Sequence, residues 1–148
     1  MPSKNPVAYV IIRTFAHATE DREKVLKALH NVLPSELSET VKLKTMNVEG
    51  HYGNPIVLFE ATVKDKKAAS VVLEKLAAGL SVLDKELLGR EVERHVDRGN
   101  LYLRLDKQAA YLGEFKLGQA DSIHLQVHFK KHMFEEVVGV VKEFGLIP

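Results

Sequence analysis

The segment SIHLQVHFK, residues 122–130, alternates polar and apolar side chains without a break. Neighbouring residues of a β-strand point to opposite faces of a sheet, so this alternation predicts a strand that is buried on one face only. The apolar set is Ile123, Leu125, Val127 and Phe129, and the polar set is Ser122, His124, Gln126, His128 and Lys130. The segment therefore predicts a sheet with one face in the core and one face in water.

Four further segments predict the strands around it. The apolar, β-branched run from Val7 to Ala16 is typical of a central strand that is buried on both faces. Residues 41–49 and 56–63 flank the turn-rich sequence GHYGNP and predict a β-hairpin, with a bulge near Thr45 where the alternation slips. Residues 101–106 alternate like residues 122–130. A hairpin together with alternating strands predicts a mostly antiparallel sheet.

Helical periodicity and capping residues predict helices between these strands and after the last one. Their limits are Thr19 to Pro34, Asp65 to Gly79, Ser81 to Val96, Asp106 to Gly113, and a last helix that ends near Phe144. The first residue of each of the first four ranges is the predicted N-cap. The expected fold is a single α+β domain over residues 1–148, with helices packed on one face of the sheet and the other face open.

The composition narrows the functional classes. The 148 residues contain no cysteine, which excludes disulfides, zinc ribbons and thiol nucleophiles, and no apolar run is long enough to span a membrane. We expect a cytoplasmic protein without a cofactor. The formal net charge is only +1, whereas proteins that bind nucleic acid through phosphates usually show a basic excess, so composition argues against RNA.

The open sheet face is the first candidate site. Strand alternation places Tyr102 and Arg104 on the polar side, beside His124, Gln126 and His128 of the neighbouring strand. Bases stack on aromatic rings and on guanidinium planes, and imidazole and amide groups can bind base edges. The alternatives are an ordinary hydrated sheet face or a surface that forms a dimer.

Other polar residues stand at the ends of predicted elements. His17 precedes a helix cap, and His51, Tyr52 and Asn54 lie in the GHYGNP loop, where a structural turn and a binding loop are equally consistent with the sequence. Around the helix that begins after Asp106, Arg104 and Lys107 could meet phosphates, with Gln108 beside them, or Asp106 could simply cap that helix. Lys130, at the end of its strand, is a further candidate for phosphate contact.

Metal binding and hydrolysis receive little support. Residues His124, His128 and His132 recur every fourth position, which in a strand separates them by about 13 Å, too far for one metal ion. A hydrolase could recruit His17, His51, Asp106 and Ser122, but the chain has no nucleophile elbow, phosphate loop or zinc-protease motif. We therefore predict neither a metal site nor catalytic residues.

Three motifs in one order resemble a known family. They are RTFAHATED (residues 13–21), GHYGNP (residues 50–55) and LYLRLDKQ (residues 101–108), and the chain is similar over nearly its whole length to an archaeal family described as RNA-binding and as a predicted exosome subunit. The resemblance implies a fold like that of the large-subunit ribosomal protein that holds 5S RNA. It also implies RNA contacts for the motif positions His17, His51, Tyr52, Asn54, Arg104, Lys107 and Gln108.

Two main hypotheses follow. In the first, the protein is a non-catalytic RNA-binding protein, accessory to RNA processing beside exosome or ribosomal components, in which Tyr102 and Arg104 stack on bases while Lys107 and Lys130 meet phosphates. In the alternative, the same sheet face pairs with a second copy or another subunit and binds no nucleic acid. A hydrolase is the third and weakest hypothesis.

Overall fold

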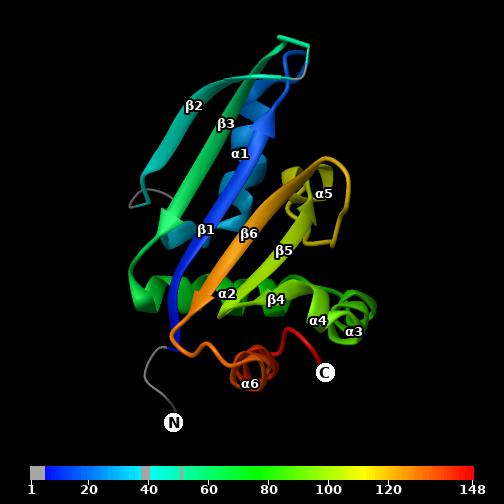
Figure 1. The fold of residues 1–148 in the computed structure, drawn as a ribbon. Coiled ribbons are helices and arrows are strands. Elements are labelled where there is room, and N and C mark those ends of the chain that lie inside the picture. Colours follow the sequence, from blue (N-terminus) through cyan, green and yellow to red (C-terminus); the bar gives the residue numbers. More distant parts are fainter. Residues whose placement is uncertain (1–5, 38–40, 51) are drawn as a thin grey trace.

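The computed structural model describes residues 6–37, 41–50 and 52–148, and they form one antiparallel sheet with its helices (Figure 1). The strand order is β2-β3-β1-β6-β5-β4, and every neighbouring pair is antiparallel. The strands are β1 (Val7–Ala16), β2 (Leu43–Glu49), β3 (Pro55–Val63), β4 (Val96–Asp97), β5 (Asn100–Asp106) and β6 (Ser122–Phe129). The long strands β1 and β6 lie side by side at the centre.

Helices cover one face of this sheet and its lower end. In Figure 1, α1 and α2 lie behind β1 and β3, and α6 lies below the sheet, where it contacts α2 and β4. The helices are α1 (Arg22–Val32), the 3-10 turn η1 (Ser35–Leu37), α2 (Lys66–Gly79), α3 (Val82–Arg90), α4 (Val92–His95), α5 (Lys107–Tyr111) and α6 (Phe134–Phe144). The predicted α+β architecture with helices on one face is confirmed.

The core lies between the sheet and the helix layer. Alternate residues of the strands meet the apolar stripes of α1 and α2 there, and each large side chain that is removed from water contributes about 1.5–3 kcal/mol. Fully buried examples are Ile12, Leu103, Leu125 and Phe129 from the strands and Leu29, Leu73 and Leu76 from the helices. The alternation that sequence shows in β5 and β6 thus assigns the inward face correctly.

The second face of the sheet carries no helix layer among the residues that the structure describes. Strand β1 is central, as predicted, but the prediction that it is buried on both faces is wrong. Ile11 and Phe15 are only partly buried and Arg13 is exposed, because no helix of the described residues lies directly over β1 on that side of the sheet. We call the side of the sheet that carries these residues the open face.

Local details differ from the sequence predictions in three places. The N-cap of α1 is Asp21, whose carboxylate accepts from Glu23 N, and not Thr19. Strands β2 and β3 pair in continuous register past Thr45, so the predicted bulge is absent. The side chains of β2, an edge strand that is largely exposed, need not alternate strictly. The register shift in the sheet lies instead between Val7 and Tyr9 of β1, where β1 pairs with β6. The predicted helix 81–96 divides at Glu91 into α3 and α4.

Candidate nucleic-acid interface

Three strands bring two arginines and a histidine into one line across the open face. In register, Arg104 of β5 pairs with His124 of β6, and His124 pairs with Arg13 of β1. Neighbouring strands lie about 4.8 Å apart, so each imidazole-to-guanidinium step spans one strand spacing. We call these three residues the arginine row. The sequence predicted Arg104 beside His124, and the register confirms that placement.

A second line of residues, which we call the tyrosine row, runs parallel to the arginine row and lies two residues away from it on each strand. It consists of Tyr102, Gln126 and Ile11, paired across β5, β6 and β1. The Tyr102 side chain is 43% exposed, which leaves part of its ring accessible. This row therefore adds an aromatic surface and an amide beside the positive charges of the arginine row.

The third line, the asparagine row, holds the second one in place. Its members are Asn100, His128 and Tyr9, and the rings of Tyr9 and His128 stack with centroids 4.8 Å apart. The Asn100 Oδ1 atom accepts from Gln126 Nε2 at 3.1 Å and from His128 Nδ1 at 2.8 Å. Because Gln126 Nε2 donates to Asn100, its Oε1 atom is left as an acceptor for other groups.

A cavity of about 540 Å³ lies over the arginine and tyrosine rows and extends to the edge of β5. Leu87 of α3 and Glu91, Arg94 and His95 of the α3–α4 segment form one wall. Residues 117–119, which precede β6, form another wall. The site is thus concave on a sheet that would otherwise be flat at this point.

The charges around the cavity are unevenly compensated. Arg13 binds Glu60 through Nε and Nη2, at 3.0 and 2.8 Å from the same carboxylate oxygen. Within the described residues Arg104 has no ion pair and only a long contact from Nη1 to Gln119 O, 3.4 Å. Of the two arginines in the arginine row, Arg104 is therefore the one with more donors left for a new anionic partner.

The surroundings of the imidazole in the arginine row lower its pKa and favour its neutral form. Partial burial lowers the pKa of His124 below its usual 6.5, and the positive charges of Arg104 and Arg13 lower it further. A bound anion would oppose these effects. Burial, followed by the neighbouring His132, likewise lowers the pKa of His128.

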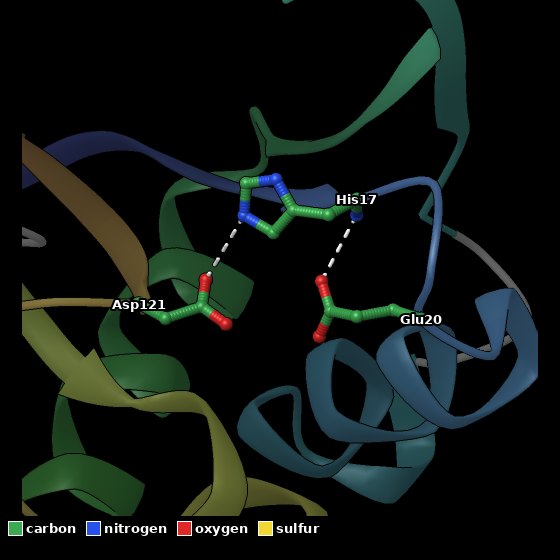
Figure 2. A group of neighbouring side chains, drawn as sticks. All are labelled: His17, Glu20 and Asp121. Atoms are coloured by element: carbon green, nitrogen blue, oxygen red, sulfur yellow. Dashed lines mark hydrogen bonds and ion pairs between the residues drawn. The ribbon is translucent and has the colours of Figure 1, made fainter. Parts of the chain in front are cut away.

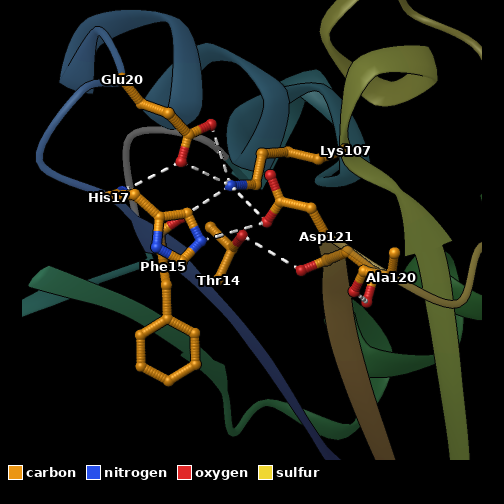
Figure 3. A network of polar contacts seen from close by, with 8 residues as sticks. Thr14, Phe15, His17, Glu20, Lys107, Ala120 and Asp121 are labelled. Carbon is orange, nitrogen blue, oxygen red and sulfur yellow. Dashed lines mark hydrogen bonds and ion pairs between the residues drawn. The ribbon is translucent and has the colours of Figure 1, made fainter. Parts of the chain in front are cut away.

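Lys107 lies away from the open face, and its buried side chain reaches a partly exposed polar cluster at the end of β1. Its ammonium donates to Phe15 O at 2.7 Å and to Glu20 at 3.0 and 3.1 Å, and it pairs with Asp121 at 2.9 Å (Figure 3). Its side chain is only 8% exposed. The expectation that Lys107 meets phosphates is corrected: its charge is already neutralised by two carboxylates.

His17 belongs to the same cluster. Its imidazole lies 3.5 Å from Asp121, and its backbone amide donates to Glu20 (Figure 2). Ligand atoms of His17, Glu20 and Asp121 all lie within 4.8 Å of one another, a grouping that could hold a metal ion. The Lys107 ammonium already binds both carboxylates, however, so the cluster has the chemistry of an ion-paired clamp that joins α5 to β1 and to the residues that precede α1 and β6.

The remaining predicted site residues are scattered. Tyr52, 85% exposed, and Asn54 lie on the exposed loop between β2 and β3, and His51 lies outside the described residues. Gln108 is exposed on α5. Lys130 follows β6 at the other end of the sheet from His124, near Lys66. The described residues of this group do not converge with the arginine row.

The side chains proposed for a hydrolase have structural partners. The Ser122 hydroxyl donates to Ala120 O at 3.4 Å, and Ser122 O accepts from the buried Thr14 hydroxyl. Asp106 caps α5 through a bond from Ala109 N, as the sequence predicted. The described residues of this group therefore do not assemble into a nucleophile and base.

Sequence reasoning missed three residues of the interface: Arg13, His95 and Asn100. Arg13 was visible as the one charged residue in the apolar run of β1. His95 was placed in a helix and does lie in α4, but helical spacing does not indicate that its Nδ1 atom donates to Tyr102 O of β5 at 2.9 Å. Asn100 stands just before the strand predicted at residues 101–106, and no sequence pattern indicates that its side chain joins Gln126 to His128.

Comparison with known proteins identifies relatives over almost the whole chain. A family model described as RNA binding matches residues 9–129. The RNA-binding protein PAB1135 of Pyrococcus abyssi is 40% identical over 149 residues, which cover 97% of each chain. The uncharacterized protein MJ0213 of Methanocaldococcus jannaschii is 30% identical over 88% of this chain and 92% of its own.

A solved structure agrees with these matches. The crystal structure of protein AF2318 from Archaeoglobus fulgidus, 27% identical, has a TM-score of 0.80 over 93% of this chain and 99% of that chain. The matched range 9–129 contains all of strands β2 to β6 and most of β1, and thus all three rows of the open face. Since the family model covers most of the chain and two relatives reach at least 30% identity, the chain belongs to this RNA-binding family.

Proposed function

We propose that the protein binds RNA without catalysis and that the open face is its RNA-binding surface. The observation that carries this proposal is the arginine row, in which Arg104 lacks an acidic partner among the described residues and lies beside His124 and the exposed ring of Tyr102. The relative from Pyrococcus abyssi is named as an RNA-binding protein, which supports the ligand class.

The arginine and tyrosine rows supply three kinds of contact. The Arg104 guanidinium binds a phosphate, and the Tyr102 ring stacks on a base, an interaction worth about 1–3 kcal/mol per base. The free Oε1 atom of Gln126 accepts from a base or a ribose hydroxyl. His124 gains a proton more readily when a phosphate lies between it and Arg104.

The near-neutral charge of the chain predicts that RNA binding depends only weakly on salt concentration. Arg13 is paired with Glu60, so few positive charges are free to replace counterions. For about two phosphate contacts to a single strand, the logarithm of the affinity falls with the logarithm of salt concentration with a slope of about −1.4. Stacking and hydrogen bonds supply the rest of the affinity, which is consistent with RNA binding at +1 net charge.

The test is fluorescence anisotropy with a labelled single-stranded RNA of about 12 nucleotides at several salt concentrations. Arg104→Ala should weaken binding about tenfold, since a hydrogen bond to a charged group contributes about 1.4 kcal/mol or more. Arg22→Ala, an exposed arginine at the start of α1, is the charge-matched control and should change the affinity less than about twofold. Equal effects of the two substitutions would place the RNA elsewhere.

We further propose that the protein assists RNA processing beside exosome or ribosomal components. The resemblance of the three sequence motifs to the archaeal family supports this role. Affinity purification of the wild type and of Arg104→Ala, each with and without ribonuclease, tests it. Light scattering tests the alternative that a second copy covers the open face, because a dimer formed there would bury Tyr102 and His124.

A further inference from the structure

The cavity beside the rows has the size of a small-ligand pocket. Its volume of about 540 Å³ lies inside the range of roughly 300–1,000 Å³ that is usual for bound small molecules. A surface that only tracks a continuous strand would need a groove along the chain of phosphates. Here the wall from α3 and α4 and the wall at residues 117–119 enclose one place on the sheet.

Both walls are attached to β5 and to each other. The His95 Nδ1 atom donates to Tyr102 O at 2.9 Å, which fixes the first wall to the tyrosine row. Gly118 N donates to Arg104 O at 2.9 Å, and a Cβ atom added to Gly118 would lie 2.8 Å from Asp106 Cα, so the second wall is as close to β5 as backbone allows. Leu117 N donates to Asp84 Oδ2 of α3 at 3.1 Å and joins the two walls. The cavity is thus preformed.

The lining matches the parts of one nucleotide. The rings and aliphatic groups of Tyr102, Leu87 and Ile11 offer apolar surface for a base. Gln126 Oε1 is a hydrogen-bond acceptor, since the amide nitrogen of that side chain donates to Asn100, and His95 Nε2 is the ring nitrogen left over when Nδ1 donates to Tyr102 O. Arg104 supplies a positive charge for the attached phosphate.

We propose that this cavity holds a single unpaired nucleotide of an RNA, with its base against Tyr102 and Gln126 and its phosphate at Arg104. This inference rests on the proposed function and names the ligand class: RNA with a bulged, looped or terminal nucleotide. A base inside an A-form helix stays in its stack and cannot enter an enclosed site, whereas an unstacked base can be bound on its face and edges.

The experiment compares three blunt-ended RNA duplexes of identical paired sequence by anisotropy, because a hairpin loop would itself present unpaired nucleotides. The first duplex is fully paired, the second carries one bulged nucleotide, and the third carries an abasic residue at the bulge. The wild type should bind the bulged duplex at least tenfold more tightly than the paired one, and the abasic duplex should lose most of that gain. Equal binding of the paired and bulged duplexes overturns this inference and leaves the proposed function standing; no binding of any RNA overturns both.

A second arm locates the bulged nucleotide. Leu87 lines the cavity and is 37% exposed, so Leu87→Trp fills the space with an indole while little of the core is disturbed. Leu83→Trp, on the same helix but 76% exposed and outside the cavity lining, is the matched control. We expect Leu87→Trp to abolish the preference for the bulge and Leu83→Trp to retain it. A preference that survives Leu87→Trp places the nucleotide elsewhere and refutes the assignment.

Discussion

Replacing the buried Lys107 by methionine tests whether the ion pairs and hydrogen bonds of this side chain stabilise the fold. Methionine keeps the length and much of the volume of the side chain but removes the ammonium. The change leaves Phe15 O, Glu20 and Asp121 without the donor that now lies 2.7 to 3.1 Å from each of them. Three segments of the chain, namely the end of β1, the turn before α1 and the residue before β6, lose their common partner on α5.

The size of the effect follows from burial. Removing one member of a buried ion pair lowers stability by about 3–5 kcal/mol, because the other charge remains without compensation. Here the Lys107 side chain is 8% exposed, but Glu20 and Asp121 are 27% and 52% exposed, so water can partly replace the ammonium. We therefore expect a loss of about 3 kcal/mol, at the lower end of that range, and a fall in melting temperature of about 6–12 °C.

Urea unfolding followed by circular dichroism measures this loss as a shift of the midpoint at constant slope. Arg94→Ala is the control, since Arg94 pairs with Glu91 at 3.8 Å and is 80% exposed, and it should change stability by less than about 0.5 kcal/mol. RNA affinity of folded Lys107→Met should stay within about twofold of wild type. A stability loss below about 1 kcal/mol, or a large loss of RNA binding in the folded variant, would refute the clamp.

Three further outcomes are expected. The folded-state pKa values of His124 and His128 lie below the unfolded value of 6.5, so the unfolded chain binds more protons as pH drops below 6.5 and the free energy of unfolding should fall. Chemical unfolding at pH 7 and at pH 5.5 measures this fall. It should be smaller in a variant with glutamine at both positions than in the wild type. Asp65→Ala removes the N-cap acceptor of Ala68 N and should lower stability by about 1 kcal/mol in urea titration, whereas a loss near zero would deny the cap. Asn100→Ala leaves two partly buried donors without their acceptor and should lower stability by about 1–3 kcal/mol by the same assay; an unchanged midpoint would show that water replaces it.

Local rules explain why most of the fold could be predicted from the sequence. The N-caps Asp65, Ser81 and Asp106 act on backbone amides three residues away, so their partners are visible in the sequence. The alternation of apolar and polar residues in β5 and β6 indicates which face of each strand packs against the helices. Both signals depend on neighbours along the chain, and both were confirmed.

The failures come from contacts between distant residues or from competition between nearby ones. Helical spacing continued to Val96, but that residue pairs with Leu101 in a tight hairpin, where Arg98 and Gly99 adopt positive φ angles of 50° and 82°, and the hairpin ends the helix. Thr19 and Asp21 are both good caps, and local sequence does not rank them.

The site was only partly predictable for the same reason. Tyr102 and Arg104 were placed correctly because register follows from alternation and from the order of the strands. Lys107 was misplaced because its partner Glu20 lies 87 residues away in sequence and nothing near Lys107 signals burial. The cavity walls could not be predicted, since they depend on how α3, α4 and residues 117–119 return to the edge of β5.

The most direct test of the open face as an RNA-binding surface is a titration of the isotopically labelled protein with single-stranded RNA, followed by amide chemical shifts. The account predicts the largest shifts in β5, β6 and β1, centred on Tyr102, His124 and Arg13, with small shifts in α1 and α2. Shifts concentrated on α1 and α2, with the arginine row unchanged, would contradict it.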